Sequence, residues 1–549
     1  MSKLSKINTL FNTVKYLKPI QIINQLKCRL PNKDSFDRYP SRQAKNNAKL
    51  FIPELDYSVE YLKRFDVDEM LRGKITILYN EFKLFSWYDE KATHLQNFNL
   101  HYFEYLIPLA YKYLETEDIR CYNLIKQLLD NWTLQNSSAD AKHPYTTSLR
   151  ILNLLIVGSI LNDQNIINSV YPQYRYLINH QEKNLLGNHY FENLKSIVIC
   201  SVIFDEEDVY RKFIKKLLDE INVQLLDDGV HCELSPMYHK IVLEGIIRIA
   251  YVLKQAGRKE MSLLIPAIQK MVTAMYSLEK GIGRTPLFND SGDNVAKDAA
   301  SILNAAKELF GIVPEDKLEF CTSGYYKLYD GSISMIVDAG EIGPSYIPGH
   351  GQCDCLSFEL SVNEKPVFVN SGTYQYQGEL RPYFRSTRAH NTVVIGETEQ
   401  SEVWGEHRVA RRIKNVHAVK IGNIIEASYT NYLNEKHSRK FVLNNYVLEI
   451  VDSVYAKVSA SIRSFLHIAE GYDILINNES ILILEVGNPI CTIQAINAKI
   501  VIHENDDFAM YSPEFGKILK TKCLEFIWEK NSKEQRIIID FKNEGEQEY

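Results

Sequence analysis

Four short segments concentrate side chains that can bind or transform an anionic ligand. They are residues 187–193 (GNHYFEN), 228–239 (DGVHCELSPMYH), 349–354 (GHGQCD) and 381–392 (RPYFRSTRAHNT). The amide and imidazole groups of the first segment can donate hydrogen bonds to a carboxylate. Tyr and His in the second and third can exchange protons, and the Arg forks of the fourth suit carboxylate or sulfate groups. The segments therefore indicate chemistry on an acidic substrate.

Each segment also has a purely structural interpretation. Residues 187–193 precede an apolar stretch, 194–204, where they would cap a helix. Asp228-Gly229 is typical of a turn, and Ser235-Pro236 is typical of a helix start with proline at the first helical position. Residues 349–354 would form a glycine-rich turn before a strand. The Arg-rich segment would be solvated surface. Taken one at a time, the segments leave both interpretations open.

The spacing of apolar residues changes along the chain. From about residue 59 to 312 it is helical, as in 99–113, 147–161 and 241–254. After about residue 320, apolar and polar residues alternate as they do in strands. The predicted strands are 334–337, 356–362, 366–369, 441–454, 480–486 and 536–541. Helices followed by strands favour two separate domains over an alternating α/β fold.

The chain, with 549 residues, is too long for one ordinary core. We therefore predict an α+β multidomain protein with an N-terminal arm (1–58), an α-helical domain (59–315) and an antiparallel β-sandwich domain (316–549). The boundary between the last two is expected within 311–322. Residues 4–30 either pack as an arm, which we favour, or form a basic amphipathic helix that touches a membrane surface.

Composition narrows the partners and the compartment. The net charge of −6 gives no general attraction to nucleic acid, so an acidic polymer requires a local basic patch. Nine cysteines without a zinc-like CxxC pair are typical of buried thiols in a reduced compartment. We see no signal-peptide core and no stretch of about 18 apolar residues, so we predict a cytoplasmic protein without a membrane span.

In their order along the chain, these segments resemble the heparinase II/III-like polysaccharide lyases. The resemblance covers about residues 95–420 and rests most strongly on GHGQCDCLSFEL, PVFVNSGTYQY and RPYFRSTRAHNTVV. NHYFENL and SPMYH resemble catalytic loops of the family, and NFNLHYFEYL and PYTTSLRILN are similar to a subgroup found among bacterial surface-polysaccharide genes. The resemblance implies an incomplete (α/α) toroid against a β-sandwich, a cleft between them, and β-elimination at a uronic acid residue of an acidic polysaccharide or oligosaccharide.

The resemblance also implies roles for individual residues. Asn188, together with His189, would bind the substrate carboxylate. Tyr238 would act as Brønsted base and acid, with nearby cationic Arg or His favouring its phenolate. His350 would be a second base or neutralise the carboxylate, and His390 would help to close the site. Further candidates for binding the acidic polymer are Arg150, His239, Arg385, Arg388 and Asn391.

Two positions depart from the family pattern. Relatives that bind zinc in the β-sandwich have His at the position of Gln352 and Asp at that of Asn370, and use both with the His that matches His390. Amide oxygens are poor zinc ligands. We therefore predict that zinc is absent or weakly bound and that no other cofactor is needed. A hydrogen-bonded network of the same three side chains would hold the loops, and Asp354 and Asn391 would orient loops through hydrogen bonds.

Two other functions remain as alternatives. The first is a carbohydrate-binding or surface-polysaccharide biosynthesis protein that has the lyase fold but does not eliminate. The second is an (α/α) glycoside hydrolase, which needs two acidic residues across a sugar. Its candidates are Glu192, Glu233, Asp290 and Asp293. The products separate the three classes, because a lyase leaves an unsaturated sugar, a hydrolase leaves a saturated one and a binding protein leaves neither.

Overall fold

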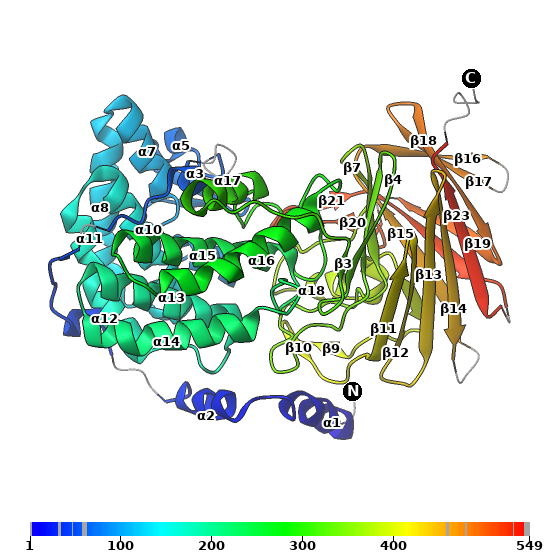
Figure 1. The fold of residues 1–549 in the computed structure, drawn as a ribbon, viewed down its shortest axis with the longest axis horizontal. Helices are drawn as coiled ribbons and strands as arrows, with labels where there is room; N and C mark the ends of the chain where they lie inside the picture. Colours follow the sequence, from blue (N-terminus) through cyan, green and yellow to red (C-terminus); the bar gives the residue numbers. More distant parts are fainter. Residues whose placement is uncertain are drawn as a thin grey trace.

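The structure is a computed structural model that describes residues 3–30, 34–46, 48–57, 63–456, 460–477, 480–504, 506–530 and 532–542. Within these residues a helical domain and a β domain lie side by side (Figure 1). Helices α1 (Lys3–Val14) and α2 (Pro19–Lys27) run along one edge of both domains. The predicted domain limits at residues 1, 58–59 and 549 lie outside the described residues.

The helical domain is an incomplete (α/α) toroid. Its apolar stripes pack α7 on α8 and α10, and α13 on α10, α14 and α15. The helices are η1 (Phe36–Arg38), α3 (Pro53–Asp56), α5 (Val67–Leu71), α6 (His94–Leu100), α7 (Leu106–Thr116), α8 (Ile119–Gln135), α9 (Ala139–Lys142), α10 (Pro144–Leu161), α11 (Gln164–Ser169), α12 (Tyr171–Asn179), α13 (Gly187–Ile203), α14 (Glu207–Gln224), α15 (Pro236–Gln255), α16 (Met261–Glu279) and α17 (Ala299–Phe310).

Three local predictions in this domain need correction, and one is confirmed. The stretch 99–113 is two helices, because the chain breaks at Phe103, whose φ is 61°. Residues 187–193 do not cap a helix but form the first turns of α13. Strands β1 (Lys74–Ile77) and β2 (Asn80–Lys83) form a hairpin where helix was expected. The start of α15 is as predicted, since the Ser235 hydroxyl accepts the third backbone N–H of the helix.

Helix α10 is long and apolar enough to cross a membrane by length and composition alone, with a hydropathy of 1.2 over Pro144–Leu161. In the structure 67% of this stretch is buried. It packs against α7, α12 and α13 in the middle of the helical core. Helix α10 is therefore apolar because it is a core helix of a folded domain.

The β domain is a sandwich of two antiparallel sheets. One sheet has the order β11-β12-β13-β14-β23-β18-β17-β16, and the other has the order β19-β22-β15-β7-β6-β5-β4-β3 with β8 paired to β15. Phe358 of one sheet contacts Phe441 of the other, with ring centroids 5.7 Å apart. The first sheet contains β11 (Lys414–Ile421), β12 (Ile424–Thr430), β13 (Lys436–Asn444), β14 (Val447–Tyr455), β16 (Tyr472–Asn477), β17 (Ser480–Glu485), β18 (Asn488–Ile496) and β23 (Glu534–Asp540).

The second sheet begins after α17 has ended at Phe310. It contains β3 (Glu319–Phe320), β4 (Tyr325–Asp330), β5 (Ile333–Asp338), β6 (Phe358–Val362), β7 (Lys365–Phe368), β8 (Val393–Ile395), β15 (Ile462–Ile468), β19 (Ala498–Glu504) and β22 (Lys522–Trp528). Outside the sheets lie α18 (Arg381–Phe384), η2 (Thr387–Ala389), β9 (Val403–Trp404), β10 (Arg408–Val409), β20 (Met510–Tyr511) and β21 (Leu519–Lys520). The run predicted at 441–454 is two strands, separated by a turn at Asn445 and Tyr446, both with positive φ.

The two domains share a buried apolar contact. Leu234 and Phe288 of the helical domain pack with Tyr325 and Ile336 of the second sheet. The Tyr325 hydroxyl also donates a hydrogen bond of 2.6 Å to the carbonyl of Leu234. This contact fixes the loops before α15 and after α16 against the β domain, and the loop after α16 borders the cavity described next.

Candidate active site between the domains

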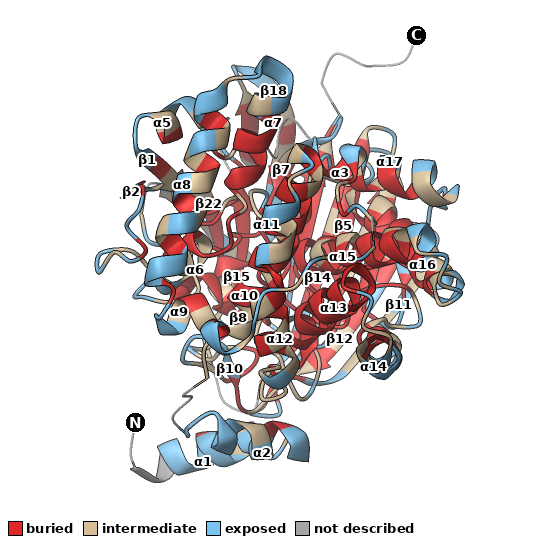
Figure 2. Cartoon of the chain, turned by 90° about the vertical axis from the view of Figure 1, so that its left-hand side faces the viewer, coloured by how far each residue is buried: buried red, intermediate tan, exposed pale blue. Residues whose placement is uncertain are grey.

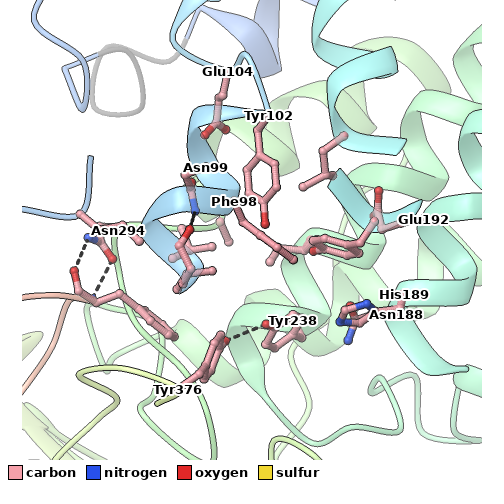
Figure 3. Close-up of a pocket in the computed structure, with 18 of the residues that line it drawn as sticks. Phe98, Asn99, Tyr102, Glu104, Asn188, His189, Glu192, Tyr238, Asn294 and Tyr376 are labelled. Atoms are coloured by element: carbon pink, nitrogen blue, oxygen red, sulfur yellow. Dashed lines mark hydrogen bonds between the residues drawn. The ribbon is translucent and has the colours of Figure 1, made fainter. Parts of the chain in front are cut away.

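A cavity of about 540 Å³ lies between the toroid and the sandwich (Figure 3). Asn188, His189 and Tyr238 line it from the toroid, and His350 and Tyr376 line it from the β domain. Its volume falls in the range of small-molecule sites, which commonly form at domain interfaces. Four of the candidates from the sequence thus converge on one cavity.

The start of α13 positions Asn188 against a buried carboxylate. Gly187 has a φ of 55°, and a Cβ there would meet Glu233 Oε1 at 2.2 Å, so only glycine fits. The Asn188 backbone N–H donates to Glu233 Oε1 (2.9 Å), and its Nδ2 donates to Oε2 (2.8 Å). Burial opposes ionisation of Glu233, but His350, His231 and the bonds from Asn188 lower its pKa. Glu233 is therefore an anion that holds Asn188 in place.

His350 stands at the centre of the site. Its Nδ1 lies 3.2 Å from Asp290 Oδ2, and its Nε2 lies 3.3 Å from Asn188 Nδ2 and 3.4 Å from Glu233 Oε2. The imidazole ring stacks on Tyr238 with a centroid separation of 3.9 Å. In the neutral imidazole, an Nδ1–H directed at Asp290 leaves Nε2 as an acceptor that faces Asn188 Nδ2, a tautomer that follows from the hydrogen-bond network.

Asp290 connects the two domains through this histidine. Asp290 belongs to the loop after α16. Its carboxylate accepts hydrogen bonds from both terminal nitrogens of Arg381, a residue of the β domain, at 2.6 and 2.7 Å. Gln352 Nε2 donates to the same carboxylate at 2.9 Å, and the Asp290 backbone N–H donates to the His350 carbonyl at 3.0 Å. Burial opposes its charge, but Arg381 and His350 hold the pKa of Asp290 well below its usual range.

Tyr238 is held as a neutral phenol. Its hydroxyl lies 2.7 Å from that of Tyr376 (Figure 3). Burial raises the pKa of Tyr238 well above its ordinary value, and Tyr376, Asp290 and Glu233 raise it further. The expectation that nearby cations favour its phenolate is therefore wrong, because the charged groups that shift the pKa of Tyr238 are carboxylates.

His189 lines the cavity with a pKa that is raised above its ordinary value. Its Nδ1 lies 2.9 Å from Glu182 Oε1, and its ring lies 4.4 Å from that of Tyr145. Burial disfavours the imidazolium, but the charge of Glu182 and its hydrogen bond outweigh burial and raise the pKa of His189. Because His189 lines the cavity, it is suited to meet a substrate carboxylate.

Two of the predicted arginines are structural. Arg150 has no exposed surface, donates to Gln173 (2.6 Å) and to backbone carbonyls, and lies 4.3 Å from the Trp132 ring centroid. Arg385 is also buried and donates to backbone carbonyls, including that of Gly351 at 3.1 and 3.2 Å. Neither lines the cavity. The prediction that they bind substrate is wrong, because their guanidinium groups are engaged within the protein.

Four other predicted residues also lie away from the cavity wall. Arg388 packs over the rings of Tyr383 and Phe508. His239 and His390 are buried, and burial lowers the pKa of His239 to about 4 and that of His390 to about 3. Asn391 donates to the carbonyls of Phe358 and Val369 and orients its loop as expected. The substrate-binding and closing roles predicted for Arg388, His239, His390 and Asn391 are therefore corrected to packing and loop support.

The region that would correspond to the relatives' zinc site does not fit a metal. Asn370 Oδ1 lies 3.1 Å from His390 Nδ1 and accepts the Ser357 hydroxyl at 2.6 Å. Gln352 turns instead to Asp290, so the predicted network forms only between Asn370 and His390. In the part of the chain that the structure describes, no three His, Cys, Asp or Glu side chains are grouped to hold a metal ion.

Several residues of the site did not stand out in the sequence. Tyr376 lies within the quoted segment PVFVNSGTYQY and Tyr145 within PYTTSLRILN, but neither had a role assigned. Asp354 accepts the Asn289 backbone N–H at 2.6 Å, as expected of a loop-orienting residue. Of the four acidic candidates for a hydrolase, Glu192 lines the cavity, whereas Glu233, Asp290 and Asp293 do not. No two of these four candidates therefore line the cavity together.

The fold and the site thus define a two-domain protein in which a helical toroid is joined to a β-sandwich and Asn, His and Tyr side chains meet in the cavity between them. The family described as heparinase II/III N-terminus matches residues 63–318, and the family described as heparinase II/III-like, C-terminal, matches residues 313–548. The chain therefore belongs to the heparinase II/III-like family.

Relatives within the family are distant. The chain is 25% identical over 317 residues to a heparin-sulfate lyase of Bacteroides stercoris, which is 52% of this chain and 46% of that protein. It is 24% identical over 445 residues to a heparin-sulfate lyase of Bacteroides thetaiotaomicron, covering 68% and 61%. The chain thus spans about half the length of the lyases it matches. A heparinase III crystal structure superposes with a TM-score of 0.71 at 16% identity, covering 92% of this chain and 88% of that one.

Replacing Asp290 by Asn should destabilise the protein by about 3–5 kcal/mol, because Arg381 would stay buried without its counter-charge. Denaturant unfolding measures this. Since the folded-state pKa of Asp290 is lowered, its contribution is full above pH ~4 and is lost only in stronger acid. Asp473→Asn is the control, since that carboxylate is 71% exposed and its ion pair is worth less than about 1 kcal/mol. Equal losses in both variants would contradict the role of Asp290.

We also propose that the chain holds no tightly bound zinc, because Gln352 and Asn370 present amides where ligands are needed. Elemental analysis of protein purified without chelator should find well below one zinc per chain, and chelation should leave the melting temperature unchanged. Stoichiometric zinc, or a melting temperature that falls with chelator, would overturn this.

Proposed function

We propose that the chain is a polysaccharide lyase that cleaves a uronic-acid-containing polysaccharide by β-elimination. The observation that carries the proposal is the convergence of Asn188, His189, Tyr238 and His350 on the interdomain cavity. Proximity of a proton acceptor, a proton donor and carboxylate-binding groups is what this reaction requires. The family membership of both domains supports the same assignment.

The first requirement is neutralisation of the uronate carboxylate. The proton at C5 becomes more acidic when positive charge and hydrogen bonds stabilise the negative charge that develops on that group. His189 and Asn188 would do this. Asn188 Nδ2 now lies between Glu233 and His350, so a substrate carboxylate would compete for the hydrogen directed at His350. Binding would thereby release the Nε2 lone pair of His350.

The second requirement is transfer of two protons. In our proposal His350 Nε2 takes the C5 proton, the C–H electrons form the C4–C5 double bond, and the C4–O bond breaks as Tyr238 protonates the departing oxygen. Tyr238 is the acid because its raised pKa keeps it protonated. This revises the expectation that Tyr238 is also the base. Since the two rings stack, acceptor and donor stand on the same wall of the cavity.

The charges of the cavity wall favour a polymer with little sulfate. Each Arg and Lys side chain that lines the cavity lies near a carboxylate. The pairs are Arg64 with Glu104 (2.5 Å), Lys195 with Glu192 (2.7 Å), Arg248 with Asp56 (2.5 Å) and Glu244 (2.6 Å), and Lys297 with Asp56 (3.7 Å). Sulfate groups call for cations that are not already compensated. We therefore propose a uronate polymer with few or no sulfate groups, of the kind found in bacterial surface polysaccharides.

We further propose a cytoplasmic location, supported by nine cysteines that are all free thiols. The alternative is a carbohydrate-binding or polysaccharide-biosynthesis protein that has the fold without the reaction. What favours it is the pair of amides at Gln352 and Asn370, two positions where the family pattern has His and Asp. The product distinguishes the two.

Ultraviolet absorbance of the unsaturated product should rise when the wild-type protein is incubated with a panel of uronate polymers. Tyr238→Phe should reduce the rate by about 10²–10⁴-fold, since it removes the general acid and leaves the ring in place. Tyr455→Phe, on an exposed ring far along the chain, should match wild type. A flat trace with polymer still bound would shift the assignment to the binding protein.

Proton exchange at C5 in deuterated buffer shows whether His350 or Tyr238 is the base. With His350 as the base, Tyr238→Phe should still exchange the C5 proton of a bound polymer, as followed by NMR, whereas His350→Gln should not. Loss of exchange in Tyr238→Phe with retention in His350→Gln would make Tyr238 the base.

Preference for unsulfated substrate should appear as a higher kcat/KM. An unsulfated polymer of glucuronic acid and N-acetylglucosamine should exceed heparan sulfate by about tenfold or more, the effect of ~1.4 kcal/mol. Lys195→Gln, which removes a cation from the cavity wall, should increase this preference for the unsulfated polymer. Equal or better cleavage of the sulfated polymer would refute the low-sulfate assignment while leaving the lyase assignment intact.

A further inference from the structure

Helix α1 exposes a continuous apolar stripe. Ile7, Leu10, Phe11 and Val14 follow the spacing of one helix face and are between 40% and 66% exposed. In a helix that packs on a folded domain, this face would normally be turned inward. Here it faces away from the protein, and the helix is largely pale blue in Figure 2.

The polar face of the arm is the one that contacts the body. In α1, the Thr9 hydroxyl donates to Glu402 (2.9 Å), and Trp404 Nε1 donates to the Thr13 hydroxyl (3.0 Å). In α2, Gln21 Nε2 donates to the carbonyls of Leu185 (3.1 Å) and Tyr346 (3.2 Å). These bonds tie the arm to both domains and fix which side faces outward.

Helix α2 also exposes apolar side chains. Ile20, Ile23 and Leu26 are exposed, and Leu30 follows just beyond the helix. Figures 1 and 2 show α1 and α2 in succession along one edge of the molecule. Soluble proteins rarely expose a contiguous apolar patch of this kind without a binding partner.

Charge identifies the partner. The first thirty residues carry six Lys or Arg and no Asp or Glu, although the whole chain has a net charge of −6. Lys6 and Lys27 are exposed on the two helices. Apolar side chains on one face of a helix with basic residues around it are the pattern of helices that lie in a membrane interface and attract anionic lipid.

We propose that the arm formed by α1 and α2 docks the protein on the surface of a bilayer that contains anionic phospholipid. The apolar stripe enters the boundary between headgroups and acyl chains, and the lysines contact the phosphate groups. The arm's bonds to Glu402 and Leu185 then hold both domains, and the cavity between them, beside the membrane. This inference does not depend on the proposed elimination reaction.

Cosedimentation of the full chain with vesicles tests the proposal. Wild type should bind vesicles of phosphatidylcholine mixed with phosphatidylglycerol, should bind pure phosphatidylcholine weakly, and should be released by salt. The double variant Phe11→Gln/Leu26→Gln should bind at least about tenfold more weakly, because it removes two apolar side chains from the interface. Lys6→Gln/Lys27→Gln should lose the preference for phosphatidylglycerol.

Leu134→Gln/Ile421→Gln is the matched control, since both side chains are highly exposed but lie outside the arm, and it should bind like wild type. Cleavage of a soluble oligosaccharide should be the same in all of these variants. Equal vesicle binding by wild type and Phe11→Gln/Leu26→Gln would overturn the proposal. So would a lipid-independent dimer in light scattering that this variant abolishes, because the stripe would then bind a second copy of the chain.

Discussion

A carboxylate without exposed surface ionises only if other groups replace the water it has lost, and Asp290 meets this condition with partners from the opposite domain. Arg381 and Gln352 of the β domain bind its oxygens, and His350 donates to it from the loop between β5 and β6. The same contacts therefore close the domain interface and set the orientation of His350. If the toroid and sandwich moved apart, the histidine would lose its support at once.

Burial affects the ionisable groups of the site in opposite ways. Asp290 and Glu233 stay charged because cations and hydrogen bonds surround them, whereas Tyr238 is kept neutral because burial, a second phenol and these two carboxylates raise its pKa. In the reaction that we propose, the neutral phenol is the acid and the neighbouring histidine is the base, so the two roles belong to two residues. The division follows from the neighbours and not from the residue types.

Positive charge is distributed unevenly over the molecule. The Arg and Lys side chains of the cavity wall lie next to carboxylates, while the first thirty residues hold basic side chains without acidic ones. In our proposals, attraction to a large anionic surface therefore comes from the arm, and recognition within the cavity comes from hydrogen bonds and from His189, whose pKa Glu182 raises.

The sequence by itself determined the order of helices and strands, because apolar periodicity is a property of neighbouring residues. Its ordered motifs resembled the family, and that resemblance implied that Asn188, His189, Tyr238 and His350 belong to one site. Tertiary structure decided which polar side chains reach the cavity. Arg150, Arg385 and His390 look equally reactive in sequence, yet each is buried against partners distant along the chain. The direction in which burial moves the pKa of Tyr238 was likewise hidden, because it depends on Asp290 and Glu233, which only the packed domains bring near it.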